Sequence, residues 1–118
     1  MTPRPLVSII ILNYNGLKFL PRCLSSLAAT EYAPTELIVA DNGSTDGSLD
    51  YLRTEYPQVK IIEFGANWGY SGAYNRAIPQ VSGKYCVLLN FDVEVEPNWL
   101  SSSIEILEQD PKIAAAQP

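Results

Sequence analysis

Short apolar segments alternate along this chain with segments whose leucines recur at helical spacing, and this alternation constrains the fold more than any other feature. The first apolar segment, Leu6 to Leu12, is nearly continuous and β-branched, as expected for a strand that is covered on both faces. One face of a helix is then formed by Leu17, Leu20, Leu24 and Leu27. Strands that alternate with helices make right-handed crossovers, so the sequence predicts an α/β fold with an open parallel sheet.

The same cycle repeats along the rest of the chain. Further strands are predicted over Glu36–Ala40, Val59–Phe64 and Lys84–Leu89, and the tail from Ile113 to Ala116 has the pattern of a strand just beginning. Further helices are predicted over Ser44–Arg53, with a cap from Ser44, Thr45 or Asp46, over Ser71–Ile78, and from Pro97 to Asp110-Pro111. We therefore expect one domain over residues 1–118, and we expect it to be a fragment of a longer polypeptide.

Composition excludes several classes of protein. With 47% hydrophobic residues, the 118-residue chain has enough apolar material for one core. Its net charge of -5 argues against binding to nucleic acid, which needs a dense basic patch. The chain has no apolar run of membrane-spanning length, and its two cysteines, Cys23 and Cys86, lie in apolar segments where buried free thiols are expected. We therefore expect a soluble, cytoplasmic segment.

Polar or small residues follow each predicted strand directly. The four clusters are Asn13-Tyr14-Asn15-Gly16, Asp41-Asn42-Gly43-Ser44, Gly65-Ala66-Asn67 and Asn90-Phe91-Asp92. Open α/β sheets bind ligands outside the carboxyl ends of their strands, so the four clusters are expected to meet at one ligand-binding edge. Ordinary turns are polar too, and the pattern is equally compatible with four connections that bind nothing.

Carboxylates must supply any chemistry, because the chain has no histidine and therefore lacks Ser-His-Asp and Cys-His catalysis and most kinds of zinc site. Asp92 stands just past a predicted strand, with Glu94 and Glu96 at alternate positions after it. These carboxylates are suitable oxygen ligands for Mg²⁺ or Mn²⁺. The alternative is a solvated acidic turn before the helix that Pro97 opens.

Two further segments have both a binding and a structural interpretation. Asp41 can accept hydrogen bonds from a nucleobase or a sugar, but Asp41-Asn42-Gly43 is also a strong turn signal. The glycine-rich residues 65–72 can bring backbone amides close to a phosphate at a helix start, but they lack the spacing of a dinucleotide site and the lysine of a P-loop.

Four motifs in register resemble family-2 glycosyltransferases in identity, order and spacing. They are Val7 to Asn15, Leu37 to Gly47, Asn67-Trp68-Gly69 with Ala73 to Ala77, and Leu88 to Val93. The resemblance extends from about Leu6 to Leu107, and the Asn-Tyr-Asn and Asp-Asn-Gly-Ser-Thr-Asp sequences look particularly like the rhamnosyltransferase-like branch.

The resemblance implies a GT-A fold, in which a Rossmann-like sheet holds a nucleoside-diphosphate sugar, UDP- or dTDP-linked, at its carboxyl edge. It places Leu12 to Asn15 beside the nucleobase, Asp41 at the base or ribose, and Asn75 and Arg76 at the nucleotide or its diphosphate. The donor-binding residues that it implies are Leu12, Asn13, Tyr14, Asn15, Asp41, Asn67, Asn75, Arg76, Asn90 and Asp92.

Asn90-Phe91-Asp92 corresponds to the D-x-D motif of that family, with asparagine in place of the first aspartate. Asp92 is therefore left as the chief ligand for Mg²⁺ or Mn²⁺, which would neutralise charge on the departing nucleoside diphosphate. The resemblance implies inverting transfer of a sugar to a glycan or lipid-linked acceptor, in bacterial cell-envelope polysaccharide synthesis at the inner face of a membrane. The general base of the family lies beyond this segment, so no catalytic base is assigned here.

Two other functions fit the pattern less well. A nucleotidyltransferase usually carries a glycine-rich, Arg- and Lys-bearing signature near the first strand, where this chain has Asn13 to Gly16 and a single Lys18. A non-enzymatic flavodoxin-like or receiver-like module would make Asp41 and Asp92 simple strand ends, but a receiver needs a lysine after a late strand, and Lys84 precedes its strand.

Overall fold

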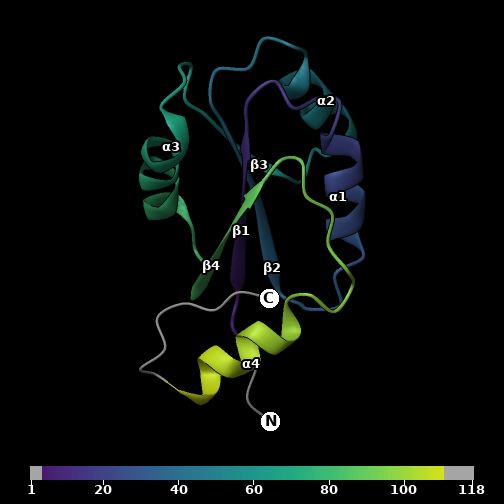
Figure 1. Cartoon of the computed structure of the whole chain (residues 1–118), viewed down its shortest axis with the longest axis vertical. Helices are drawn as coiled ribbons and strands as arrows, with labels where there is room; N and C mark the ends of the chain where they lie inside the picture. Colours follow the sequence, from purple (N-terminus) through teal and green to yellow (C-terminus); the bar gives the residue numbers. More distant parts are fainter. Residues whose placement is uncertain (1–3, 111–118) are drawn as a thin grey trace.

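The computed structural model describes residues 4–110 and contains one four-stranded parallel sheet (Figure 1). In chain order the strands are β1 (Val7–Asn13), β2 (Thr35–Asp41), β3 (Lys60–Glu63) and β4 (Tyr85–Asn90). Their order in the sheet is β3-β2-β1-β4, and every neighbouring pair is parallel. The predicted α/β class and parallel sheet are confirmed.

Helices cover both faces of the sheet. Helices α1 (Leu20–Ala28) and α2 (Ser48–Glu55) lie on one face, and α3 (Gly69–Ala77), continued by the 3₁₀ turn η1 (Ile78–Gln80), lies on the other (Figure 1). Helix α4 (Ser101–Gln109) lies past the amino ends of the strands. None of the helices in residues 4–110 has the length and apolarity required to cross a membrane.

The core has two layers because the side chains of β1 point alternately to the two faces, and all seven residues of this strand are buried. Val7, Ile9 and Ile11 pack with the apolar face of α1, and Ile10 and Leu12 pack toward α3. Helix α3 presents small residues, Ala73 and Ala77, to the sheet, and both are fully buried. A central strand buried on both faces explains the continuous apolar run at the start of the sequence.

Three helices begin later than the sequence predicts. Helix α1 starts at Leu20, and Leu17 lies in the turn before it. Helix α2 starts at Ser48, and Gly47 with φ 89° is its N-cap. The side chains of Ser44 and Asp46 accept hydrogen bonds from the β1–α1 loop, and Asp46 Oδ1 also accepts one from the Ser48 N–H at 3.0 Å. Helix α4 starts at Ser101, four residues after Pro97, because the Pro97 carbonyl oxygen accepts a hydrogen bond from the Glu31 N–H and the residues between form a turn.

The prediction of a buried thiol is confirmed for Cys23 and is wrong for Cys86, which is exposed on β4. Strand β4 is an edge strand in the described sheet, and α3 packs over β1 and β2 beside it. The α3-facing side chains of β4 are therefore left open, and Leu88 is 46% exposed. The strand predicted at Ile113–Ala116 lies outside the described residues.

Candidate functional site

The chain reverses its direction of progress through the sheet at β1, which lies between β2 and β4. The connection that leaves β1 crosses one face through α1, and β4 is entered from the other face after α3 (Figure 1). Open α/β sheets bind ligands outside the carboxyl ends of their strands at such a reversal of strand order. The loops that follow β1 and β4 lie against each other at this edge, and both continue along α1. Asn13 to Gly16 and Asn90 to Asp92 therefore meet at one edge of the sheet, as predicted from the strand ends.

A buried polar network supports the edge between β1 and β2. Asn13 and Asp41 are partners in the sheet register, and both are fully buried. The Asn13 Nδ2 donates to Asp41 Oδ1 at 2.9 Å. Ser44 donates to the same carboxylate twice, from its hydroxyl at 2.7 Å and from its backbone N–H at 2.9 Å. The carboxylate of Asp41 thus lies under the loop surface and holds it, and its predicted contact with a base or ribose stays a prediction.

The β1–α1 loop is fastened to the β2–α2 loop by further hydrogen bonds. Asn15, with φ 50°, accepts a bond from the Thr45 N–H through Oδ1 at 2.7 Å, and its own N–H donates to the Ser44 hydroxyl at 2.9 Å. The Leu17 N–H donates to Asp46 Oδ2 at 3.0 Å. These bonds make the two loops one structural unit.

The hydrogen bonds of Asp46 affect its acidity. Burial acts to raise the pKa of this carboxyl, but hydrogen bonds from the Ser48 hydroxyl and from the backbone N–H groups of Leu17 and Ser48 outweigh it and hold the pKa below its ordinary value. The charged form of Asp46 is therefore the one that ties the loops together.

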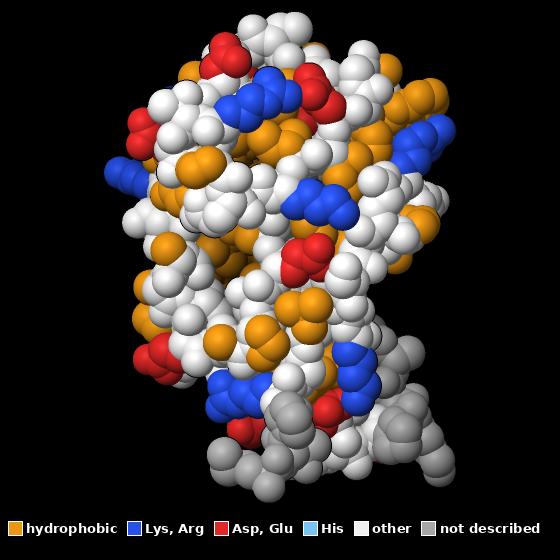
Figure 2. Space-filling model, turned by 180° about the vertical axis from the view of Figure 1, so that it is seen from behind, with side chains coloured by type: hydrophobic (Ala, Val, Ile, Leu, Met, Phe, Trp, Pro, Cys, Tyr) orange, Lys and Arg blue, Asp and Glu red, His pale blue; other side chains and the backbone are white. Residues whose placement is uncertain are grey.

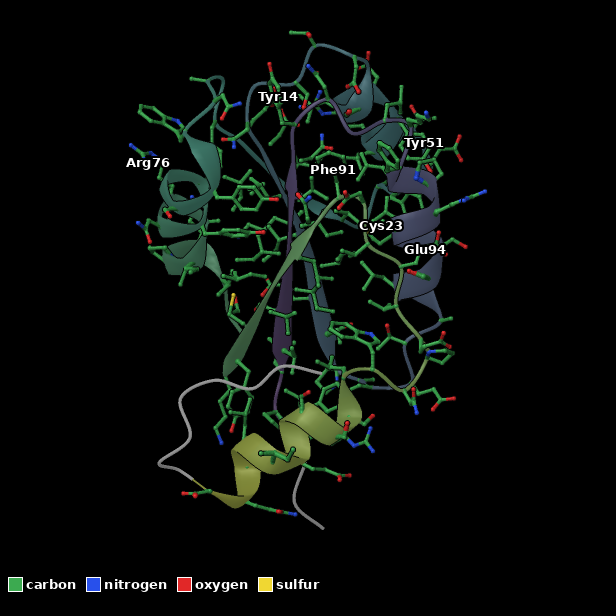
Figure 3. All side chains as sticks on the ribbon, viewed as in Figure 1. Tyr14, Cys23, Tyr51, Arg76, Phe91 and Glu94 are labelled. Atoms are coloured by element: carbon green, nitrogen blue, oxygen red, sulfur yellow. The ribbon has the colours of Figure 1, made fainter. Side chains whose placement is uncertain are left out.

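Gly16 allows the β1 and β4 loops to approach each other. A Cβ at this position would lie 2.5 Å from Asn13 Oδ1 and 2.6 Å from the ring of Phe91. The Gly16 N–H donates to Asn13 Oδ1 at 3.2 Å. Phe91 packs against Phe19 with the ring centroids 5.8 Å apart, and Tyr14, labelled nearby in Figure 3, is 46% exposed at the edge. The absence of a Cβ at Gly16 therefore sets how closely the two loops approach each other.

Asn42 connects the β2 loop to the glycine-rich segment. Its Nδ2 donates to the Gly69 carbonyl oxygen at 3.2 Å, and its Oδ1 accepts from the Trp68 N–H at 3.1 Å. The positive φ of Gly43, 81°, brings this loop against the backbone of Ala66. The sequence places Asn42 in a polar turn and in the motif from Leu37 to Gly47, but it does not indicate which distant backbone the amide of Asn42 contacts.

The predicted contact residues on and near α3 make local contacts in the structure. Arg76 lies on the side of α3 away from Phe91 (Figure 3), where its guanidinium stacks 3.8 Å from the Trp68 ring centroid and donates to the Gly72 carbonyl oxygen at 3.0 Å. Asn75 is exposed on the same helix, and Asn67 is exposed and caps the Gly69 N–H through Oδ1 at 2.8 Å. The structure thus does not bring Arg76 together with Asn90 to Asp92.

The acidic residues after β4 do not converge. Asp92 is exposed and accepts from Asn90 Nδ2 at 2.9 Å. Glu94 turns toward α1, where it lies 4.0 Å from Arg22, and Figure 3 shows it beside that helix. Burial, and then the charges of Asp92 and Glu94, raise the pKa of the Cys23 thiol on α1 to about 11. The acidic segment therefore runs along α1 instead of folding around one point.

This donor set fits a divalent cation only in part. No group of three His, Cys, Asp or Glu side chains that could hold a metal is found within residues 4–110. Mg²⁺ is typically held by one or two carboxylates together with waters and substrate phosphates, so a single exposed carboxylate is a sufficient protein contribution. Asp92 meets this requirement, with the Asn90 amide beside it.

One face of the molecule carries charges of both signs. Figure 2 shows Lys and Arg side chains interspersed with Asp and Glu on this face. This mixture agrees with the net charge of -5.

Comparison with known proteins shows which family the sequence matches. Residues 8–118 match the model of the family described as glycosyl transferase family 2. An uncharacterized glycosyltransferase of Haemophilus influenzae is 32% identical over 114 residues, which are 94% of this chain and 35% of that protein. The N-acetylglucosaminyl-diphospho-decaprenol L-rhamnosyltransferase of Mycobacterium tuberculosis is 29% identical over 121 residues, covering 93% of this chain and 39% of the relative. The chain thus spans little more than a third of the length of these relatives.

A solved structure has the same arrangement of strands and helices. The mannosyltransferase PcManGT from Pyrobaculum calidifontis, in complex with GDP-Man and Mn²⁺, superposes with a TM-score of 0.85 at 25% identity and covers 95% of this chain and 34% of that one. This similarity confirms the GT-A fold predicted from the sequence.

Proposed function

The chain belongs to glycosyl transferase family 2, and from this membership we propose that it holds the nucleoside-diphosphate-sugar donor of a glycosyltransferase at the carboxyl edge of its sheet. The observation that supports the proposal most is the meeting of the β1 and β4 loops, Asn13 to Gly16 and Asn90 to Asp92, at the carboxyl edge where the strand order reverses. The buried Asn13–Asp41 pair at this edge is a rigid base for a ligand site, because each of its polar groups is already hydrogen-bonded.

The nucleobase and ribose are proposed to lie on the β1 side of this edge. Leu12 to Asn15 end in an exposed aromatic ring, Tyr14, on which a base can stack. We propose UDP- or dTDP-linked sugars as donors. Because the related mannosyltransferase was solved with GDP-Man, guanine nucleotides belong in any test.

The diphosphate is proposed to lie toward β4, where Asp92 would hold Mg²⁺ or Mn²⁺. When bound, the cation supplies positive charge that stabilises the departing nucleoside diphosphate. Asn90 donates to the Asp92 carboxylate at 2.9 Å and thereby restricts its orientation. Arg76 is directed away from this place by its stacking on Trp68, and Asn75 is exposed on α3, so a contact of either residue with the diphosphate is proposed only for the ligand-bound protein.

The complete reaction is proposed to transfer the sugar, with inversion, to a glycan or lipid-linked acceptor. The rhamnosyltransferase of Mycobacterium tuberculosis is named for a diphospho-decaprenol acceptor, which supports the lipid-linked class. The acceptor site and the general base are not assigned to any residue of this chain.

Chemical-shift mapping by NMR tests the proposed donor site. UDP, dTDP and GDP are added separately to the ¹⁵N-labelled protein with Mg²⁺ present, and the amide signals are followed. We expect at least one nucleotide to shift signals of residues 13–16, 41–44 and 90–92, while those of α4, at the other end of the sheet, stay in place. Shifts confined to α4 and the amino ends of the strands, or no shift with any nucleotide, would contradict the proposal.

A further inference from the structure

Tyr74 makes the side-chain hydrogen bond that joins α3 to β4. Its hydroxyl donates to the Leu89 carbonyl oxygen at 2.9 Å, and its ring is partly buried against the core cluster that contains Ile10 and Leu12. The residue was not among the predicted site residues, although it lies inside the matching motif between Ala73 and Asn75.

The hydrogen bond from Tyr74 reaches the edge strand of the described sheet. Helix α3 packs its backbone over β1 and β2, and β4 is held on one flank by β1, with which its pairing ends at Leu12 and Asn90. In the described sheet β4 has no strand on the other flank. The Tyr74 side chain thus holds the backbone of β4 at Leu89, directly before Asn90.

The Tyr74 hydroxyl stays protonated at physiological pH. Burial, with smaller effects from Tyr70 and Cys86, raises the pKa of Tyr74 to about 12. The hydroxyl therefore keeps its proton at neutral pH and remains a donor to Leu89.

We propose that Tyr74 is a positioning residue, which holds the Asn90–Asp92 turn relative to α3 and thereby sets the affinity for the donor and its cation. The inference rests on the proposed donor site. Asn90 directly follows Leu89, so the hydrogen bond from Tyr74 fixes the backbone immediately before the turn that carries Asp92. Removing it would leave β4 paired with β1 up to Asn90 but loosen the turn that follows.

The test compares Tyr74→Phe with a matched control, Tyr32→Phe. Tyr32 is 4% exposed, and its hydroxyl also donates to a backbone carbonyl oxygen, that of Pro5, at the amino end of the sheet. Both variants keep the ring and lose one hydroxyl. Three quantities are measured: the ¹³C shift of the Leu89 carbonyl, the backbone order parameters of residues 90–92, and the dissociation constant for UDP with Mn²⁺.

For Tyr74→Phe we expect a shifted Leu89 carbonyl signal, lower order parameters at residues 90–92, and an affinity for UDP with Mn²⁺ that is roughly fivefold weaker, as loss of one hydrogen bond predicts. Tyr32→Phe should change none of the three. Wild-type order parameters and affinity in Tyr74→Phe, or an equal loss in Tyr32→Phe, would overturn the inference. In a protein that binds no nucleotide, the order parameters alone decide whether Tyr74 holds the turn, so failure of the donor site is a separate result.

Discussion

Asn13 and Asp41 end adjacent strands side by side, and the amide of Asn13 donates to the carboxylate of Asp41 at 2.9 Å with neither side chain exposed. A buried charge is tolerated only when it is hydrogen-bonded, and here two further bonds come from Ser44. Removing either member of the pair should therefore lower the free energy of unfolding, which can be measured.

Asp41→Ala should destabilise the fold strongly, because it removes the acceptor of both Ser44 donors and leaves the buried Asn13 amide with only the Ser44 hydroxyl as acceptor, at 3.1 Å. We expect the free energy of unfolding to fall by about 3 kcal/mol, measured by urea denaturation. Asp50→Ala is the control, since Asp50 is exposed on α2 and its loss should cost less than about 1 kcal/mol. Equal losses in the two variants would contradict the supporting role of Asp41.

Gly16→Ala should be costly for a steric reason. Its Cβ would lie 2.5 Å from Asn13 Oδ1 and 2.6 Å from the Phe91 ring, so one of the two loops must move, at a cost of about 1–3 kcal/mol in unfolding free energy. In a Phe91→Leu background part of the contact is relieved. Thermal unfolding of the single and double variants should therefore show a smaller effect of Gly16→Ala when Phe91 is absent. Strict additivity would rule out the proposed contact.

Acid should weaken the link between the β1 and β2 loops. The pKa of Asp46 is lower in the folded protein than its ordinary value of 3.8, so its stabilising effect is complete above that value and is lost as the pH falls through and below it. Asp46→Asn removes this titration. Urea midpoints measured from pH 6 to pH 3 should fall less steeply in the variant than in the wild type. The exposure of Asp46 keeps the difference small, and parallel curves would show that its charge has no role.

The two cysteines should differ in reactivity. Burial raises the pKa of Cys23 to about 11 and its side chain is 1% exposed, whereas Cys86 is exposed on β4, although burial raises its pKa as well. A thiol reagent at pH 8 should modify one equivalent in the native protein and the second only after unfolding. Cys86→Ser should abolish the native reaction. Two fast equivalents would mean that α1 does not cover Cys23 as described.

The sheet and its polar edge could be predicted from the sequence because they depend on local pattern. The continuous apolar run at Leu6 to Leu12 requires burial on both faces, and the polar residues after each strand then meet at one edge by topology alone. The pairing of Asn13 with Asp41 is a consequence of the same rule, although their hydrogen bond could not be inferred.

Features that depend on distant contacts could not be predicted. The start of α4 depends on the bond between Pro97 and Glu31, and the direction of Arg76 depends on the Trp68 ring. The exposure of Cys86 follows from α3 lying over β1 and β2. None of these partners is marked by spacing in the sequence, which is why an apolar strand was expected to be buried throughout.

Calorimetric titration with UDP, dTDP and GDP, each with and without Mn²⁺, tests the central claim most directly. It is carried out on the wild type, on Asp92→Asn, and on Glu94→Gln as the control, because Glu94 is directed toward Arg22. We expect binding of at least one nucleotide to require Mn²⁺ and to weaken roughly tenfold or more in Asp92→Asn, while Glu94→Gln binds as the wild type does. Nucleotide binding that is indifferent to Mn²⁺ and to Asp92, or no binding by the folded protein, would contradict a donor and cation site at this edge of the sheet.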